Sequence, residues 1–301
     1  MSPGPRRVRT LLVAGLAAAV LAWLASSAFV AWRLTHRKRP PYAESVPARG
    51  EGRVREEVVA TRDGQRLGAW FLPRASPRAA VLVLHGNGGS RSDMIDLALW
   101  LSDQGLAVLV PSLRAHGDST GDSNDFGWSA REDVLACVGD LEVRAPGVPI
   151  VVYGCSLGAV AAIYAARELG PRVAGYALEA PYRDVRSATR HRLRLFLPPV
   201  LDQLAFAGLE LFAPPMLAPD LDLLAPIDHV AGIPAATPVV FLSGTADVHA
   251  PTAEVEEIRA RCGARAAMVL FPGADHRSLW ALEPARLHAA LLELVADSVR
   301  R

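Results

Sequence analysis

The pentapeptide Gly-Cys-Ser-Leu-Gly at 154–158 constrains the fold of this chain more than any other segment. It follows an apolar run at 150–153 that is typical of a strand, and it leads into an alanine-rich run at 157–169 that is typical of a helix. A sharp turn must join the two, and its central residue adopts a strained backbone that leaves no room for side chains two positions away. Glycine at both ends of the pentapeptide meets this need. The segment therefore predicts a strand, a tight turn that exposes the hydroxyl of Ser156, and a helix.

Short apolar runs alternate with longer helical patterns along most of the chain after residue 54. Runs typical of strands lie at 54–60, 66–71, 80–84, 107–110, 150–153, 173–178, 238–242 and 266–271, and helical patterns lie at 92–104, 129–143, 157–169, 252–261 and 284–299. The first two strands flank Asp63-Gly64, which favours a hairpin. This alternation predicts an α/β fold with a mostly parallel sheet covered by helices on both faces.

One segment, from about residue 182 to about residue 234, breaks the alternation. It is rich in leucine, phenylalanine, proline and arginine, and it contains no obvious strand. An insertion of this size in an otherwise regular fold is typically structured, so we expect a short helical cap. The domain that carries this cap is expected to cover residues 54–301.

Residues 1–40 differ from the rest of the chain. Arginines within 6–9 precede an uncharged apolar stretch from Leu11 to Trp32, and a second basic cluster follows at 33–39. About 22 helical residues span about 33 Å, enough to cross a hydrocarbon core of about 30 Å. We therefore predict a single-pass N-terminal membrane anchor over 1–40 and a linker at 41–53, where prolines and glycines gather.

A cleaved signal peptide is the alternative interpretation of this N-terminal segment. Ser26 and Ala28 are small residues at a suitable spacing for cleavage, which would release the domain as a secreted protein. We favour the uncleaved anchor because the apolar stretch is longer than an ordinary signal core and a basic cluster follows it. The two basic flanks are almost equal, so the positive-inside rule leaves the side of the membrane open.

A serine hydroxyl is a weak nucleophile, so Ser156 needs a base, and the base needs an acid that orients it. His276 follows the last predicted strand, and Asp247 follows the strand before it. The order serine, aspartate, histidine is the order in which strand–turn–helix serine enzymes of this type deliver these residues. Glu179, at the end of the strand after the nucleophile helix, is the alternative acid. We predict Ser156, Asp247 and His276 as the catalytic residues.

Negative charge that develops on a substrate carbonyl oxygen needs hydrogen-bond donors already in position. Leu157 follows the nucleophile at the start of a helix and supplies one backbone N–H. The loop His-Gly-Asn-Gly-Gly at 85–89 follows the strand at 80–84, and we expect the second backbone N–H from Asn87. We expect His85 to be structural rather than a proton carrier.

The remaining composition argues against other classes of partner and site. The chain has 32 basic and 31 acidic residues for a net charge of +1, which gives no reason to expect nucleic acid. Its three cysteines, at unrelated spacings, offer neither a disulfide framework nor a metal site, and no phosphate-binding glycine loop occurs. The turn at 114–119 contains His116 and Asp118, but we interpret it as a brace for the nucleophile loop. No cofactor and no metal are predicted.

These segments together resemble the α/β-hydrolase superfamily over about residues 55–301. The similarity rests on the 85–89 loop, the Arg-Ala-His-Gly turn at 114–117, the 154–158 pentapeptide, Asp247 with the following Ala250-Pro251, and His276. Ala115 stands where glycine is usual, and Ala250 where valine is usual. The resemblance implies an eight-stranded, mostly parallel sheet and hydrolysis of an ester, thioester or amide, as in membrane-anchored esterases with this loop.

From the resemblance and the residues we expect a serine hydrolase that cleaves carboxylic esters through an acyl-enzyme at Ser156. Its partners would be a small-molecule ester, lipophilic if the apolar cap and the anchor place the site near a bilayer, and the membrane itself. Thioesterase, amidase or acyltransferase chemistry on the same residues stays open, as does a non-catalytic membrane-anchored binding protein on this fold. The acyl and alcohol groups and the oligomeric state are not specified by these motifs.

Overall fold

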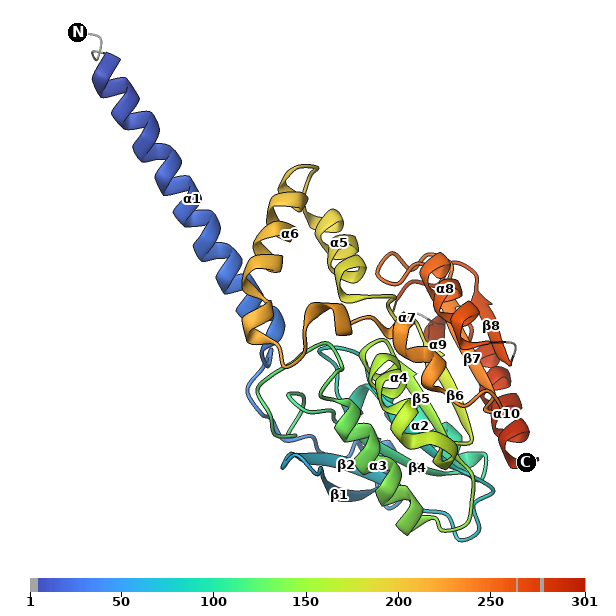
Figure 1. Cartoon of the computed structure of the whole chain (residues 1–301). Coiled ribbons are helices and arrows are strands. Elements are labelled where there is room, and N and C mark those ends of the chain that lie inside the picture. Colours follow the sequence, from blue (N-terminus) through green and yellow to red (C-terminus); the bar gives the residue numbers. More distant parts are fainter. Residues whose placement is uncertain (1–4, 264, 277–278, 301) are drawn as a thin grey trace.

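The computed structural model describes residues 5–263, 265–276 and 279–300 (Figure 1). Its centre is one sheet in the order β1-β2-β4-β3-β5-β6-β7-β8. The strands are β1 (Arg55–Ala60), β2 (Arg66–Leu72), β3 (Ala80–Leu84), β4 (Ala107–Pro111), β5 (Ile150–Cys155), β6 (Gly175–Glu179), β7 (Val239–Gly244) and β8 (Ala266–Phe271). β1 pairs with β2, and β2 with β4, in antiparallel fashion, and every other pair is parallel. The predicted eight-stranded, mostly parallel sheet is confirmed.

Helices cover both faces of this sheet, as the alternation predicts. The helices are α1 (Pro5–Thr35), α2 (Ile95–Asp103), α3 (Arg131–Arg144), α4 (Leu157–Leu169), α5 (Val185–Phe196), α6 (Leu201–Phe212), α7 (Pro226–His229), α8 (Thr252–Cys262), α9 (Leu279–Leu282) and α10 (Pro284–Val299). Side chains of α3, α4 and α8 share one apolar core with the sheet, and those of α2 and α10 share the other. The central strands β3 and β4 are buried along their whole length because both faces are covered.

The start of α2 differs from the prediction of a helix over 92–104. Arg91–Met94 forms a tighter 3₁₀ turn, and α2 begins only at Ile95. Ser90 and Asp93 explain the shift, because each side chain accepts a hydrogen bond from the backbone of this turn and together they form a capping box. The turn ends the loop at 85–89 and fixes its exit from the sheet.

The segment between β6 and β7 contains an antiparallel pair of helices, α5 and α6, that projects beyond the sheet, and α6 lies beside the lower part of α1 (Figure 1). The rest of α1 extends away from the domain. The stretch Val8–Thr35 is long and apolar enough to cross a membrane by length and composition, with a mean hydropathy of 2.1.

The segment that follows α1 is bound to the domain. The guanidinium of Arg37 donates to the carbonyl oxygens of Gly117 and Gly121, each at 3.1 Å, and to that of Ser119. Further on, the fully buried carboxylate of Glu44 pairs with Arg91 at 2.9 Å. Residues 41–53, which the sequence indicates as a linker, therefore lie against the sheet domain.

Candidate active site

The nucleophile turn has the strained geometry that the pentapeptide predicts. Ser156 has φ 48° and ψ −105°, in the left-handed half of conformational space that side chains rarely adopt. A Cβ on Gly158 would lie 2.6 Å from Cβ of Leu84, and one on Gly154 would lie 2.5 Å from the backbone nitrogen of Ala159. Glycine is therefore required at both positions, and the turn raises the Ser156 hydroxyl at the carboxyl end of β5.

Three side chains from three different loops meet at this end of the sheet. Nε2 of His276 lies 3.0 Å from Oγ of Ser156, and Nδ1 of His276 lies 2.7 Å from Oδ2 of Asp247. In the tautomer that satisfies both contacts, Nδ1–H donates to the carboxylate and Nε2 accepts from the hydroxyl. Ser156 and Asp247 are buried, and the His276 side chain is 14% exposed. The arrangement is that of a nucleophile, a base and an orienting acid.

The Asp247 carboxylate is fixed by its own loop. Its Oδ1 accepts hydrogen bonds from the backbone N–H groups of His249 at 2.8 Å and Ala250 at 2.9 Å. The acid and histidine loops lie close together because residue 244 is glycine: a Cβ there would lie 2.8 Å from the carbonyl carbon of Ala274. Asp275, next to the histidine, is exposed.

The loop at 85–89 lies beside the nucleophile, as expected for a donor of the second N–H. A Cβ on Gly86 would lie 3.6 Å from Cβ of Ser156. The Asn87 side chain accepts from Asn124 at 2.9 Å, while Gly88 N–H donates to Nε2 of His116 at 3.1 Å. Within the described residues, neither the backbone N–H of Asn87 nor that of Leu157 donates a hydrogen bond to the protein. Both groups can therefore donate to a ligand.

Two buried histidines hold this loop in place, and neither is bonded to the Ser156 hydroxyl. Nε2 of His85 accepts from Leu113 N–H at 2.9 Å, and burial lowers the pKa of His85 to about 4. Burial and the neighbouring His85 lower the pKa of His116 to about 3. The turn at 114–119 therefore braces the 85–89 loop, whereas the sequence suggested that it braces the nucleophile loop.

Glu179, the alternative acid, lies beneath the nucleophile. Its carboxylate accepts from the Tyr153 hydroxyl and lies 3.6 Å from Sγ of Cys155. Burial raises the pKa of Glu179, and no hydrogen bond joins it to His276. Sequence reasoning missed this buried Tyr153–Glu179 contact, because nothing in the spacing of these residues predicts it.

A cation from the cap was also missed. Arg192 on α5 is half-buried, its Nη1 donates to Ala188 O at 2.9 Å, and burial lowers the pKa of its guanidinium against the opposing influence of Tyr182 and Asp247. Among the described residues, no carboxylate lies within ion-pair distance of Arg192. The run of arginines at 183–194 could have indicated a cationic cap, but not which member lies near enough to Asp247 to interact with it electrostatically.

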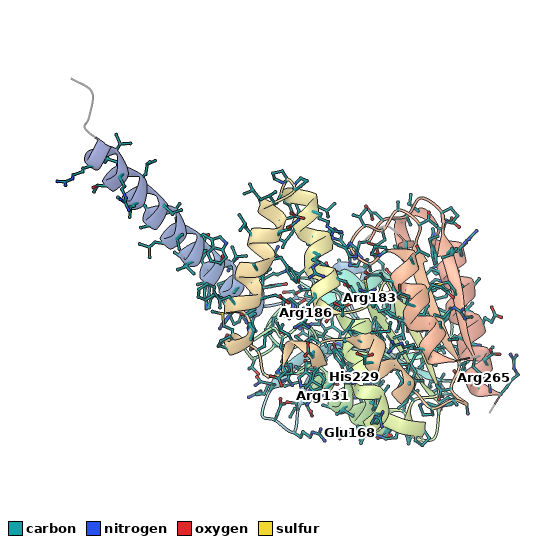
Figure 2. The ribbon with its side chains drawn as sticks, turned by 45° about the horizontal axis from the view of Figure 1, so that its top comes forward. Arg131, Glu168, Arg183, Arg186, His229 and Arg265 are labelled. Atoms are coloured by element: carbon teal, nitrogen blue, oxygen red, sulfur yellow. The ribbon has the colours of Figure 1, made fainter. Side chains whose placement is uncertain are left out.

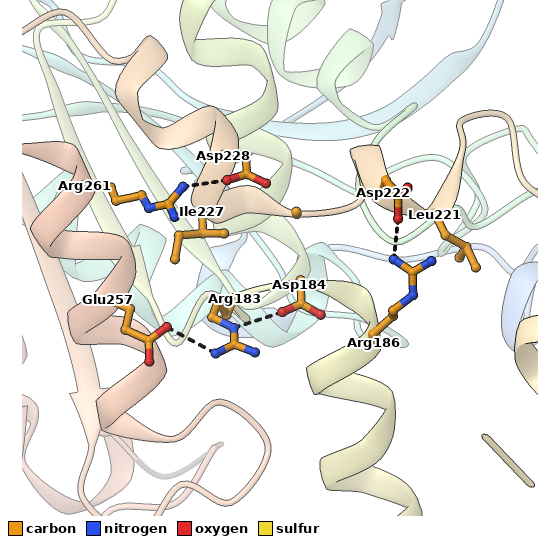
Figure 3. A pocket seen from close by; sticks show the side chains of 10 residues that line it. Arg183, Asp184, Arg186, Leu221, Asp222, Ile227, Asp228, Glu257 and Arg261 are labelled. Carbon is orange, nitrogen blue, oxygen red and sulfur yellow. Dashed lines mark hydrogen bonds and ion pairs between the residues drawn. The ribbon is translucent and has the colours of Figure 1, made fainter. Parts of the chain in front are cut away.

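A cavity of about 470 Å³ lies elsewhere, at the N-terminal end of α5 (Figure 3), where Arg183 and Arg186 are labelled in Figure 2. Its arginines are already paired: Arg183 with Asp184 and Glu257, Arg186 with Asp222, and Arg261 with Asp228. Neither Ser156 nor Asp247 nor His276 lines it. Because its charges neutralise one another, we do not assign it to the chemistry of Ser156.

In the described part of the chain, no group of three or more histidine, cysteine, aspartate or glutamate side chains could hold a metal ion.

Comparison of the sequence with known proteins finds a matching family model and several relatives. A family model described as serine aminopeptidase, S33, matches residues 75–218. An uncharacterised protein of Mycobacterium tuberculosis is 31% identical over 241 residues, which cover 78% of this chain and 75% of that protein. Human monoglyceride lipase is 33% identical over 127 residues, covering 41% of this chain and 42% of the lipase.

A solved structure shares the fold, and a further relative is similar over part of the sequence. The esterase Pf2001 of Pyrococcus furiosus superposes with a TM-score of 0.69 at 23% identity, covering 86% of this chain and 97% of the esterase. Lysophosphatidylserine lipase ABHD12 of Macaca fascicularis is similar in sequence only over 121 residues, at 31% identity, covering 38% of this chain and 30% of that lipase.

Proposed function

This chain belongs to the α/β-hydrolase superfamily of serine hydrolases, and we propose that it cleaves carboxylic esters through an acyl-enzyme at Ser156. The observation that carries the proposal is the hydrogen-bonded row from Ser156 through His276 to Asp247, with distances of 3.0 and 2.7 Å. Lipases and esterases among the similar proteins support ester hydrolysis, and they favour a small lipophilic substrate.

The proposed reaction has two half-reactions. The Ser156 hydroxyl attacks the ester carbonyl while Nε2 of His276 takes its proton, and the N–H groups of Asn87 and Leu157 stabilise the oxyanion. His276 then returns the proton to the departing alcohol, which leaves an acyl-enzyme. Water, activated by the same imidazole, attacks the acyl carbonyl and releases the carboxylic acid. Asp247 holds the ring and stabilises the imidazolium in both steps.

We further infer that α1 is an uncleaved single-pass membrane anchor. Its length and hydropathy support this, and so does the position of Ser27 and Ala31, which are buried against the rest of the protein. A signal peptide is removed from the mature protein and has no reason to pack on it.

Labelling with a fluorophosphonate probe tests the nucleophile. The full chain in detergent should be labelled, Ser156→Ala should not, and Ser298→Ala should behave as wild type because Ser298 bonds Ala174 at the opposite end of the sheet. Folded wild-type protein that stays unlabelled would contradict the proposal and favour a non-catalytic binding protein.

A panel of matched oxygen esters, thioesters and amides then tests the bond. The highest kcat/KM is expected for oxygen esters, and a preference for thioesters or amides would replace the ester assignment while leaving the Ser156 mechanism in place.

A further inference from the structure

The α1–α6 contact is a continuous helix pair in constant register. Nε1 of Trp23 donates to Leu204 O at 3.1 Å, and Oγ1 of Thr35 lies 3.7 Å from the sulfur of Met216, in the 3₁₀ turn Pro214–Met216 that follows α6. Between these contacts Ser27 lies opposite Gly208, where a Cβ would be 2.6 Å from Cβ of Ser27. The offset along the two chains is the same at all three levels, so the helices run parallel and in step. Small residues let the backbones approach closely.

Hydrogen bonds also hold the segment just after the C-terminal end of α1. Arg37 N–H donates to Asp122 O at 2.7 Å, and the Arg37 side chain bonds three carbonyl oxygens of the 117–121 turn. Because α6 holds the side of α1 and the 117–121 turn holds the segment just after its C-terminal end, α1 cannot turn freely as it would on a flexible linker. Any bilayer that contains α1 therefore meets the domain in one orientation.

The register places α6 alongside the apolar part of α1. Leu201, at the start of α6, lies at the level of Val20, and the apolar stretch ends at Trp32. The distance between these levels is about 18 Å at 1.5 Å per residue, more than half of a hydrocarbon core of about 30 Å. If α1 spans a membrane, α6 must lie within or against the leaflet that the C-terminal half of α1 enters.

The outer surface of the hairpin suits that position. Leu201, Leu204 and Leu211 are about half exposed and fall on one face of α6, together with the exposed Ala207. At the turn between the helices, Phe196 is 79% exposed and Val200 63% exposed. This apolar surface is continuous with the exposed apolar surface of α1, and aqueous exposure of such a surface would be costly.

The charges of the hairpin are compatible with the membrane interface. Arg194 pairs with Asp202, with Nε 3.8 Å from Oδ2, and the guanidinium of Arg190 stacks 4.2 Å from the centre of the Phe206 ring. Both arginines are exposed, and long cationic side chains extend from an apolar surface to lipid phosphates. A hairpin with an apolar stripe and flanking arginines is typical of a segment in the interface.

We propose that the α5–α6 hairpin inserts into the leaflet entered by the C-terminal half of α1, so that the catalytic site opens toward lipid. α5 connects the two places: its buried face packs through Ala188 on Tyr182 and on Tyr164 of α4, the helix that Ser156 precedes, and its C-terminal end is Phe196. The substrate class is then an ester that resides in the bilayer and enters along the hairpin. This inference rests on the proposed anchoring by α1 and, for the substrate, on the proposed ester hydrolysis.

Photocrosslinking of the full chain in phosphatidylcholine vesicles that carry an alkyne-tagged lipid tests the insertion. Benzoylphenylalanine replaces Phe196 in one variant, Val143 in the control, which is 80% exposed on α3, and Phe29 in a third variant that reports on α1. We expect at least about tenfold more lipid adduct at 196 than at 143. Equal adducts at 196 and 143, with strong adduct at 29, would overturn the inserted hairpin and leave the anchor in place.

A second experiment separates the entry route from the chemistry. In Phe196→Asp, hydrolysis of a long-chain monoester embedded in the same vesicles should fall about tenfold, with hydrolysis of a water-soluble short-chain ester unchanged, and Val143→Asp should change neither. Unchanged vesicle activity, or an equal loss on both substrates, would overturn the proposed route. Wild-type protein inactive on both esters would contradict only the ester chemistry, since the lipid adducts do not depend on turnover.

Discussion

The imidazole of His276 is held at both nitrogens, and this decides which carboxylate can serve it. Nδ1 lies 2.7 Å from Asp247, whose other oxygen is tied to two backbone N–H groups. A carboxylate fixed in this way keeps the ring in the tautomer that accepts from Ser156. Glu179 is as deeply buried but bonds the Tyr153 hydroxyl instead.

Asp247→Asn should therefore lower kcat by about 10³- to 10⁴-fold, because the amide favours the wrong tautomer of His276. Glu179→Gln should lower it by less than about tenfold, since it only alters the support below the nucleophile. Steady-state hydrolysis of a p-nitrophenyl ester measures both. The reverse ranking would transfer the role of the acid to Glu179.

The buried His116 makes the free energy of unfolding decrease as the pH falls. Its pKa is about 3 in the folded chain and about 6.5 when exposed, so between these values the unfolded chain binds more protons. The stabilisation is full above pH 6.5 and is lost as the pH falls. His85, with a pKa of about 4, acts in the same sense, whereas Asp133, raised to about 6 by burial, acts in the opposite sense.

Comparison with His116→Gln isolates this contribution, since glutamine can still accept from Gly88. Urea unfolding of the full chain in detergent, followed by tryptophan fluorescence, should show a loss of unfolding free energy from pH 7 to pH 4.5 that is about 3 kcal/mol larger in wild type than in the variant. Parallel pH profiles for the two proteins would refute the assignment.

The meeting of Ser156, Asp247 and His276 could be predicted because each follows a strand whose end the sequence marks. Ser156 follows an apolar run through a glycine turn, and Asp247 and His276 follow the last two runs, β7 and β8, which reach the same edge of the sheet. Arg192 and the Tyr153–Glu179 contact could not be predicted, because they depend on which faces meet after folding. Local spacing carries no information of that kind.

At the scale of elements, close approach is controlled by glycine. Gly158 lies where β3 and the nucleophile helix touch, and Gly208 lies where α6 touches α1. Strands and helices of the sheet domain could be predicted from alternation, but the α1–α6 contact could not, because both helices are apolar on several faces and no periodicity selects a partner.

Gly158→Ala should destabilise the chain by about 1–3 kcal/mol and abolish most activity, since the new methyl group would collide with Leu84 and tilt the nucleophile turn. Gly139→Ala on α3 is the matched control. A methyl group there meets only the end of Arg172 at 3.6 Å, so the variant should be unchanged or slightly more stable. Thermal unfolding and probe labelling measure both effects, and a fully active Gly158→Ala would contradict the role of the turn.

Gly208→Leu should separate α6 from α1, because its side chain would occupy the position of Ser27. Hydrogen exchange should then accelerate in the amides of α6 and remain unchanged in the strands of the sheet. If exchange in α6 is unaltered, the two helices are not held together by this contact.

At the scale of the whole molecule, the segment before the sheet is part of the folded domain. Arg91 is buried and bonds the carboxylates of Glu44 and Asp118, at 2.9 and 2.5 Å, and Ser112 also donates to Glu44. The chain between α1 and β1 is thereby attached to the region that supports the 85–89 loop.

Glu44→Ala should lower the free energy of unfolding by about 3 kcal/mol, because it removes a partner of a buried guanidinium. Asp96→Ala breaks an exposed pair with Arg49 and should cost less than about 1 kcal/mol. Denaturant titration of both variants distinguishes the two cases, and equal losses would show that residues 41–53 contribute no more than surface charge.

Arg37 determines where the protein can be shortened. A fragment that begins at Pro41 lacks this arginine and leaves three carbonyl oxygens of the 117–121 turn without their donor, next to the histidine that supports Gly88. A fragment that begins at Ala31 keeps all of these bonds. A water-soluble fragment, whether it is expressed or released from cells by a protease, therefore keeps these bonds only if the cut lies upstream of Arg37.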